Sequence, residues 1–341
     1  MPWSRAQAVR VARGAGLAVV ATGLAATLLL AGGMAALVVS GRGDPPATAR
    51  GAGDDALWLG HAWVDGRRTQ ADLDALALRL RPGGIRDVFV HVGPLSPRGS
   101  LDPGLRPRAR WLVSALHQAV PGLRVQAWLG QVVGRGHLDL GSAQARARVL
   151  GSARQVLADG FDGIHYDLEP VPDGDAGYLD LLAGTHALTR PRGLILSVAA
   201  FQIEPLPLLR FPDRLVTGHP HWWSTGYLRQ VSRQVDQVAV MAYDTGLPSR
   251  AAYTGYVRRQ TALALRAVPD DVDLLIGVPA FRADNLGHHA SAETLTAAIR
   301  GVRLGAGAHP PRRPPGLALF ADYTATPGDW TVYLAEWSSP R

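Results

Sequence analysis

The chain has 341 residues, of which 47% are hydrophobic and 18% charged, the composition of a packed globular protein rather than a disordered one. Its 35 basic residues, all of them Arg, exceed the 28 acidic residues and give a formal net charge of +7. The arginines are scattered rather than clustered among aromatic residues, so we expect no nucleic-acid partner. The absence of cysteine excludes disulfides, thiol catalysis and Cys-ligated zinc.

The amino terminus has the pattern of a membrane anchor. Arg5, Arg10 and Arg13 precede a stretch at residues 14–40 without any charge, and about 20 apolar residues suffice to span a bilayer as a helix. The apolar region of a cleaved signal peptide is shorter, about 7 to 15 residues, so we expect a retained single-pass anchor in the cell membrane, with secretion after cleavage as the alternative. The predicted parts are residues 1–13 in the cytoplasm, 14–40 in the lipid bilayer, 41–55 as a linker, and 56–341 as one extracytoplasmic domain.

From residue 56 onward, short apolar runs alternate with stretches of helical periodicity, which is the pattern of successive βα units and a parallel sheet. Eight such units fit a TIM barrel, an α/β fold whose active sites lie at the carboxyl ends of the strands. The main rival is an open doubly wound sheet, but the Gly-rich phosphate loop typical of that fold does not follow the first run. In chain order we predict a strand at Leu57–Val64, a helix at Thr69–Leu80, strands at Asp87–Val92 and Leu123–Leu129 with a helix at Arg108–Val120 between them, a helix at Ser142–Ala158, strands at Gly163–Glu169, Leu194–Ala200, Gln237–Tyr243, Leu274–Ala280 and Leu317–Tyr323, and a last helix beginning at Thr326 and Pro327.

The segment at residues 161–170, FDGIHYDLEP, carries the strongest chemical signal. Alternate residues of a strand share a face, so His165, Asp167 and Glu169 are expected to point to one spot. Such carboxylates can simply cap neighbouring loops, and with Asp244 the three could ligate a divalent metal. No second His follows at a recognisable metal-binding spacing, so we expect no metal and no cofactor.

Two motifs in this chain resemble those of the family 18 glycoside hydrolases, the chitinase-like TIM barrels. Residues 162–169 (DGIHYDLE) look like the family's D-G-x-D-x-D-x-E strand, and residues 241–244 (MAYD) look like its M-x-Y-D motif. The order and the strands are those of the family. His165 departs from the pattern, because the family has an Asp there. The family's Ser-x-Gly-Gly on the third strand is also absent, and its eighth-strand Trp has no clear counterpart, so Tyr323 is expected in that role.

The resemblance implies an O-glycosyl hydrolase for glycans with β-linked N-acetylglucosamine, chitin-like or from a cell wall. Glycoside cleavage needs an acid for the leaving oxygen and stabilisation of the positive charge at the anomeric carbon. In the family, the acetamido oxygen of the substrate is the nucleophile, and the configuration is retained. Carried over residue by residue, the roles implied are Glu169 as the acid, Asp167 orienting the acetamido group, Tyr243 donating a hydrogen bond to its oxygen, Asp244 contacting the sugar or the acid, and Asp162 and His165 in support. His165 could hydrogen-bond Asp167 and change charge near neutral pH.

Sugar rings bind on the faces of aromatic side chains, and several are candidates. Trp63 and Trp128 stand near the ends of the first and third runs. The pair Trp222 and Trp223 is expected to line the substrate site or else to begin a packed helix. His288 and His289 are expected in a solvated turn. Two functional alternatives stay open: a carbohydrate-binding barrel with weak or no catalysis, and a metal-dependent polysaccharide hydrolase or deacetylase.

Overall fold

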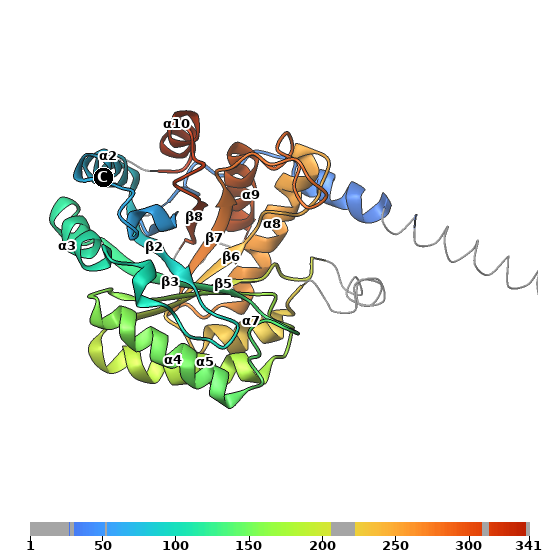
Figure 1. Cartoon of the computed structure of the whole chain (residues 1–341). Coiled ribbons are helices and arrows are strands. Elements are labelled where there is room, and N and C mark those ends of the chain that lie inside the picture. Colours follow the sequence, from blue (N-terminus) through green and yellow to red (C-terminus); the bar gives the residue numbers. More distant parts are fainter. Residues whose placement is uncertain (1–26, 28–30, 52, 206–221, 309–313, 339–341) are drawn as a thin grey trace, which may run out of the picture.

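Eight parallel strands close into a barrel in the order β1 to β8 in a computed structural model of the protein, so the predicted TIM barrel is confirmed (Figure 1). The structure describes residues 27, 31–51, 53–205, 222–308 and 314–338. The strands are β1 (Asp55–Leu59), β2 (Ile85–Pro94), β3 (Arg124–Val132), β4 (Gly163–Glu169), β5 (Ile195–Ala200), β6 (Gln237–Met241), β7 (Asp273–Pro279) and β8 (Gly316–Phe320).

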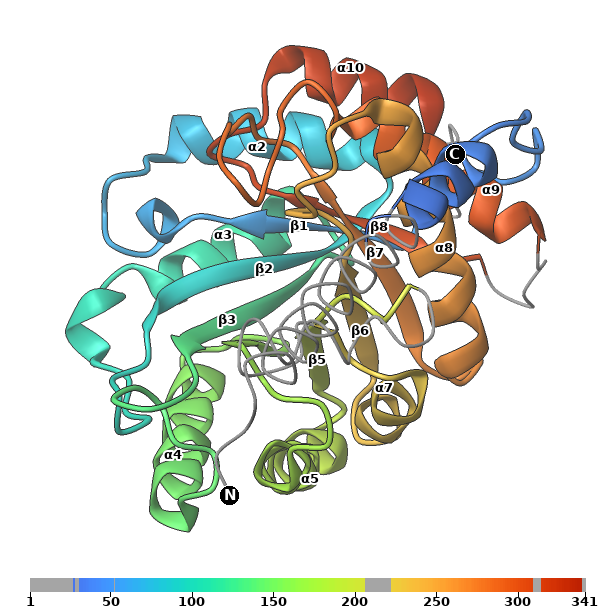
Figure 2. The same ribbon diagram turned by 90° about the vertical axis from the view of Figure 1, so that its right-hand side faces the viewer.

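Helices surround this barrel, as the view in Figure 2 shows. They are α2 (Gln70–Gly83), α3 (Ala109–Ala119), α4 (Ala143–Ala158), α5 (Ala176–Thr189), α7 (Thr225–Ser232), α8 (Arg250–Ala267), α9 (Leu295–Ala308) and α10 (Pro327–Glu336), with short 3-10 helices at His61–Trp63, Pro103–Leu105 and Arg190–Arg192. Local signals fix several helix starts. Thr69 and Asp72 form a capping box at α2, Thr326 and Asp329 form another at α10, and Ser142 caps α4.

The first and last strands are shorter than the sequence predicts. β1 ends at Leu59, and the residues up to Trp63 turn into a 3-10 helix, while β8 ends at Phe320 instead of Tyr323. Trp63 and Val64 are buried although they lie outside the strand, which explains why the apolar run continues. A hydrophobic run in the sequence indicates that its residues are buried, but a buried turn can have the same composition as a buried strand.

Residues 41–51, predicted as a linker, lie against the barrel. Arg300 of α9 donates to the Gly43 carbonyl, and Arg303 donates to the Ala49 carbonyl. The Gly51 amide donates to the Trp337 carbonyl just after α10. Backbone hydrogen bonds to helix side chains hold this segment in place, a type of contact that linker composition does not reveal.

Most of the predicted transmembrane segment lies outside the described residues. Its last part, residues 31–40, is a helix that leads into the bound segment at residues 41–51. No helix within the described ranges is both long and apolar enough to cross a bilayer.

A layer of charged and amide side chains fills the amino-terminal end of the barrel. Asp87 is fully buried and accepts hydrogen bonds from Arg124, Gln126 and Gln237, with donor–acceptor distances of 2.5 to 3.0 Å. Arg124 also contacts Asp273 at 3.2 Å, which connects β2, β3 and β7. The charges are therefore paired across strands that are distant in sequence.

Replacing Asp87 with Ala is expected to lower the free energy of unfolding by about 3–5 kcal/mol, because it leaves the Arg124 guanidinium partly buried without its main partner. Urea unfolding followed by circular dichroism measures this difference. Asp74→Ala is the matched control, since Asp74 is exposed on α2. Equal effects of the two substitutions would contradict the importance of the buried layer.

Candidate active site

The strand β4 places two carboxyl groups at the carboxyl end of the barrel. Its register pairs Asp167 with Gly130 and Glu169 with Val132 of β3. Both residues therefore lie in the last few positions of the strand, just before the loops begin. Three buried polar atoms at this place have no hydrogen-bond partner among the described residues: Trp128 Nε1, Asp167 Oδ1 and Glu169 Oε1. Unsatisfied buried polar atoms are rare in proteins, and a catalytic role is one explanation for them.

Burial changes the protonation of this pair. It raises the pKa of the Asp167 carboxyl to about 6, although the nearby Trp128 indole and Glu169 carboxyl partly offset it. Burial also holds the pKa of Glu169 well above its usual value, and the charges of Asp167 and Asp244 raise it further. The pair therefore favours a state with one proton over a state with two negative charges, and the charge of Asp167 favours that proton on Glu169.

The segment after β6 brings Tyr243 and Asp244 to the same end of the barrel. Burial raises the pKa of the Tyr243 hydroxyl well above 10, and the charges of Asp167 and Glu169 raise it further, so this hydroxyl stays a donor. The Tyr243 ring stacks on Phe320, with centroids 5.5 Å apart, and meets the edge of Phe281. The structure thus gathers Asp167, Glu169, Tyr243 and Asp244, the four residues to which the sequence assigns catalysis.

His288 is buried, so the expected solvated turn is wrong for this residue. Its Nδ1 lies 3.0 Å from Asp244 Oδ1 and 3.5 Å from Glu293 Oε2. Both neighbours are carboxylate oxygens, so Nδ1 carries the proton. Glu293 is held in turn by the Thr245 and Gly246 amides. This second layer orients Asp244, whose backbone is in the left-handed region at φ 55°.

His165 does not contact Asp167, which corrects the expected support role. Its Nε2 accepts a hydrogen bond from Trp58 at 3.2 Å, and its Nδ1 lies 2.8 Å from Ser197 Oγ. The ring stacks on Phe89 with centroids 3.7 Å apart and is fully buried. Burial pushes the pKa of His165 well below 6.5, so the imidazole stays neutral and does not titrate near neutral pH.

Asp162 also lies elsewhere, because it precedes β4 at the amino-terminal end of the barrel. Its carboxylate accepts from the Val125 amide and contacts His117 Nε2, both at 2.7 Å. Seven strand residues at about 3.3 Å each separate it from Glu169 by roughly 23 Å. A role in supporting catalysis by contact is therefore wrong, and Asp162 instead joins β4 to β3.

The predicted aromatic residues differ in whether they line a pocket or are enclosed in the core. Trp128 and Tyr323 line a pocket of about 380 Å³ together with His61 and His91, and Tyr323 is 52% exposed. Trp63 is buried and donates to Asp322, so its ring has no free face for a sugar.

The two residues of the tryptophan pair differ as well. Trp223 is buried and donates to the Val171 carbonyl, which supports the packing alternative and corrects its assignment as a substrate-binding residue. Trp222 is partly exposed, and for it substrate contact stays a prediction.

Phe320, which the sequence did not single out, is the aromatic residue at the end of β8. Its ring lies within 5.5 to 6.1 Å of the rings of Trp58, Trp128, Tyr243 and Phe281. Phe320 therefore lies among the aromatic residues at the barrel mouth, whereas Tyr323, the residue expected in the role of the family's eighth-strand Trp, is exposed. Phe320 belongs to the eighth apolar run, but the sequence alone does not distinguish a Phe at this position from an ordinary core residue.

Metal ligation would need several of these side chains to converge. Within the described ranges no three His, Asp or Glu side chains are arranged to hold a metal ion. Both nitrogens of His165 are engaged by Trp58 and Ser197, so the imidazole proposed as a metal ligand points elsewhere.

Acidic groups at the carboxyl ends of the strands of an α/β barrel occur in several classes of enzyme, and comparison with solved structures is more specific about the fold. No protein-family model and no curated protein matches the sequence. The structure matches the C-terminal domain of a putative chitinase from Desulfitobacterium hafniense with a TM-score of 0.59 and 14% identity over 85% of this chain and 99% of that chain.

Two further matches agree with the first. The spore cortex-lytic enzyme SleL of Bacillus megaterium gives a TM-score of 0.58 and 13% identity, over 87% of this chain and 77% of that chain. A chitinase of Chromobacterium violaceum gives 0.57 and 15%, over 82% and 97%. The chain therefore has the chitinase fold, and the resemblance to the family 18 glycoside hydrolases is confirmed at the level of the fold.

Proposed function

We propose that this protein is a glycosidase that hydrolyses glycans with β-linked N-acetylglucosamine by a substrate-assisted, retaining mechanism. One observation carries the proposal: the Glu169 carboxyl, whose pKa burial and the charge of Asp167 hold well above its usual value, lies beside Asp167 at the mouth of a barrel with the chitinase fold. A carboxylic acid beside a carboxylate supplies the proton and the negative charge that glycoside cleavage requires.

In this mechanism each group acts on a defined atom of the substrate. Glu169 gives its proton to the glycosidic oxygen while the acetamido oxygen of the substrate attacks the anomeric carbon, so the bond between that carbon and the glycosidic oxygen breaks and the leaving sugar departs as an alcohol. The negative charge of Asp167 stabilises the positive charge that develops on the acetamido group, and the Tyr243 hydroxyl donates to its oxygen. Water then opens the cyclic intermediate as Glu169 takes a proton back, which restores the original configuration.

The pocket at Trp128 and Tyr323 supports binding of an adjoining sugar. Trp128 lies beside Asp167 and also lines this pocket, which therefore adjoins the catalytic pair. The exposed Tyr323 offers a ring face at the rim. We assign the pocket to a sugar unit next to the cleaved bond.

The uncharged segment at residues 14–40 supports a location at the cell membrane with the barrel outside. The substrate would then be a glycan in the wall or the surroundings of the cell. Binding of such a glycan without turnover is the second candidate function, favoured by the neutral His165 at a position where the family has an Asp.

Turnover of chitin oligomers, peptidoglycan and poly-N-acetylglucosamine by the purified chain tests the proposal. Glycosidase activity predicts new reducing ends with one of these substrates, none with Glu169→Gln, and a first product of retained β configuration by proton NMR. Binding with no turnover, equal in the wild type and in Glu169→Gln, would instead establish the second candidate. An inverted product would overturn the substrate-assisted mechanism.

Asp244→Asn is expected to move the alkaline limb of the pH–rate profile to lower pH. The negative charge of Asp244 raises the pKa of Glu169, so its loss lets Glu169 give up its proton at a lower pH. The quantity to measure is kcat/KM from pH 4 to 10. Asp284→Asn is the control, because it changes a carboxylate on the loop that carries His288. An alkaline limb at the same pH in Asp244→Asn and the wild type would contradict the assignment of Glu169 as the acid.

A further inference from the structure

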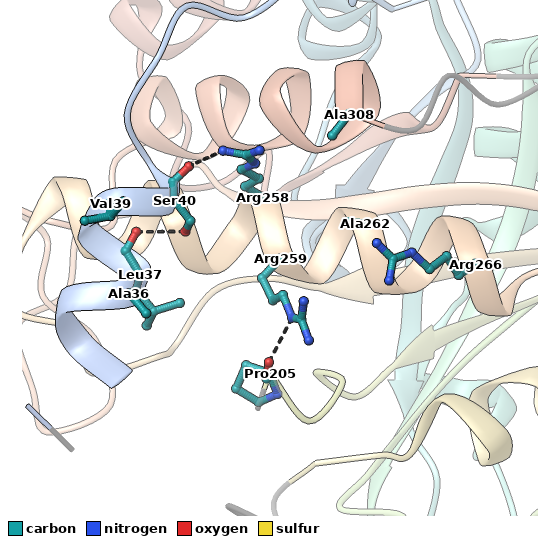
Figure 3. A pocket seen from close by; sticks show the side chains of 10 residues that line it. All are labelled: Ala36, Leu37, Val39, Ser40, Pro205, Arg258, Arg259, Ala262, Arg266 and Ala308. Atoms are coloured by element: carbon teal, nitrogen blue, oxygen red, sulfur yellow. Dashed lines mark hydrogen bonds between the residues drawn. The ribbon is translucent and has the colours of Figure 1, made fainter. Parts of the chain in front are cut away.

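The helix at residues 31–40 is fixed against α8 by close backbone contact (Figure 3). At Gly255 of α8, an added Cβ would lie 1.9 Å from the Leu37 carbonyl oxygen. At Gly41, an added Cβ would lie 2.5 Å from the Ala251 carbonyl oxygen. Arg258 donates to the Ser40 carbonyl at 2.6 Å, where the helix ends. Only glycine allows such an approach at both positions, so the orientation of this helix relative to the barrel is set by the sequence.

A groove of about 580 Å³ lies beside this contact. One wall is the helix, with Ala36, Leu37 and Val39, and Val39 is 60% exposed. The other wall is the face of α8 that carries three arginines, and no Asp or Glu lines the groove among the described residues. The groove thus has one apolar wall and one cationic wall.

The three arginines differ in their engagement. Arg258 binds the Ser40 carbonyl, and Arg259 donates from Nε to the Pro205 carbonyl at 2.9 Å, its only hydrogen bond in the part of the chain that the structure describes. Within the described ranges, the terminal nitrogens of the Arg259 guanidinium therefore remain for an anion. Arg266 is exposed and lies seven residues, two helical turns, further along the same face of α8.

We propose that this groove binds the phosphate headgroup of an anionic phospholipid of the membrane in which the chain is anchored. Arg259 and Arg266 bind the phosphate, and the helix wall at Ala36 and Val39 lies along the acyl chain. The inference rests on the proposed anchor at residues 14–40. It follows from continuity, because the uncharged stretch runs directly into the helix that forms the apolar wall. It follows also from charge, because arginine matches phosphate geometry and is attracted to anionic lipid surfaces.

The consequence is that α8 and α9 face the bilayer and that the barrel stands in one orientation on the membrane. The hydrogen bonds of Arg300 and Arg303 to residues 43–49 hold the rest of the connection to the barrel. A barrel held in this way reaches substrate close to the membrane, whereas a barrel on a flexible linker would also reach substrate farther away.

Lipid binding by the full chain in neutral detergent tests the inference. Native mass spectrometry and thermal unfolding are recorded with dioleoyl phosphatidylglycerol and with dioleoyl phosphatidylcholine. We expect phosphatidylglycerol to bind and to raise the Tm, and phosphatidylcholine to do neither. Arg259→Gln/Arg266→Gln should weaken phosphatidylglycerol binding about 30-fold, because each arginine near an anionic surface contributes roughly a fivefold factor.

Arg154→Gln/Arg192→Gln is the matched control, because it removes two exposed arginines at α4 and after α5 and should leave phosphatidylglycerol binding unchanged. Equal binding of the two lipids, or equal losses in the two double variants, would overturn the headgroup site. So would a Tm shift reproduced by inorganic phosphate alone. Flotation of the full chain with liposomes of pure phosphatidylcholine tests the anchor separately. If the chain floats with these liposomes but shows no headgroup preference, the anchor stands and the headgroup site in the groove is wrong.

Discussion

Glu169→Gln is expected to lower kcat/KM for a chitin oligomer by about 10²- to 10⁴-fold, the contribution typical of general acid catalysis. The substitution keeps the size and shape of the side chain but removes the proton that the leaving oxygen needs. Burial and the charges of Asp167 and Asp244 raise the pKa of the wild-type carboxyl well above its usual value and so favour the protonated form. Reducing-end assays of wild type and variant at the same enzyme concentration measure the ratio.

The leaving group provides a sharper comparison within the same variant. An N-acetylglucosaminide with a nitrophenolate leaving group needs little protonation, so Glu169→Gln should lose much less rate on it than on a sugar leaving group. Glu336→Gln controls for the loss of a carboxyl group, because Glu336 is the last residue of α10 and its charged neighbours are Arg303 and Arg50. Equal losses on both substrates would show that Glu169 is not the proton donor.

The barrel could be predicted because its signals are local and repeated. Alternating apolar runs, capping residues such as Thr69, Ser142 and Thr326, and glycines at helix ends each reflect one βα unit. The strand ends could not be predicted, because apolar runs continue beyond the strands. Trp63, for example, is buried in the 3-10 helix that follows β1. The bound state of residues 41–51 was equally hidden, because it depends on Arg300 and Arg303, some 250 residues away.

The first layer of the site could be read from two motifs, but its supports could not. Asp167, Glu169 and Tyr243 converge because strand register places motif residues at one end of the barrel. His288 looks like part of a polar turn in the sequence, yet it is fully buried against Asp244 and Glu293. Periodicity predicts which face a strand residue occupies, but it says nothing about a loop that folds back over the site.

The prediction for His165 fails in the opposite way. This residue was expected to support Asp167, but both of its ring nitrogens bond to other residues. The spacing places it below Asp167, but a strand repeat of two residues is long enough for other partners to intervene. Trp58 and Ser197 satisfy both ring nitrogens, and Phe89 covers one face. A neutral, fully bonded imidazole fills the space in the barrel core without adding a charge beneath Asp167. The proton balance of the site therefore depends on Asp167, Glu169 and Asp244 and not on His165.

The second large effect is expected for Tyr243→Phe, which should lower kcat about 100-fold, as removal of one stabilising donor does in other enzymes. The Tyr243 hydroxyl keeps its proton because burial and the charges of Asp167 and Glu169 raise its pKa well above 10. Phe retains the stacking on Phe320 and the contact with Phe281, so the ring should stay in place. The loss should appear in kcat more than in KM, because the hydrogen bond holds the acetamido oxygen in the position from which it attacks the anomeric carbon.

Tyr166→Phe separates this effect from a general loss of packing. Tyr166 is adjacent to Asp167 on β4 but points to the outer layer, where its hydroxyl lies 2.9 Å from Thr185 Oγ1. Both substitutions remove one buried hydroxyl, so both should lower the Tm slightly, and only Tyr243→Phe should lower kcat. Equal values of kcat in the two variants would mean that the Tyr243 hydroxyl does not contact the substrate. The stabilisation of the acetamido group would then come from the charge of Asp167 alone.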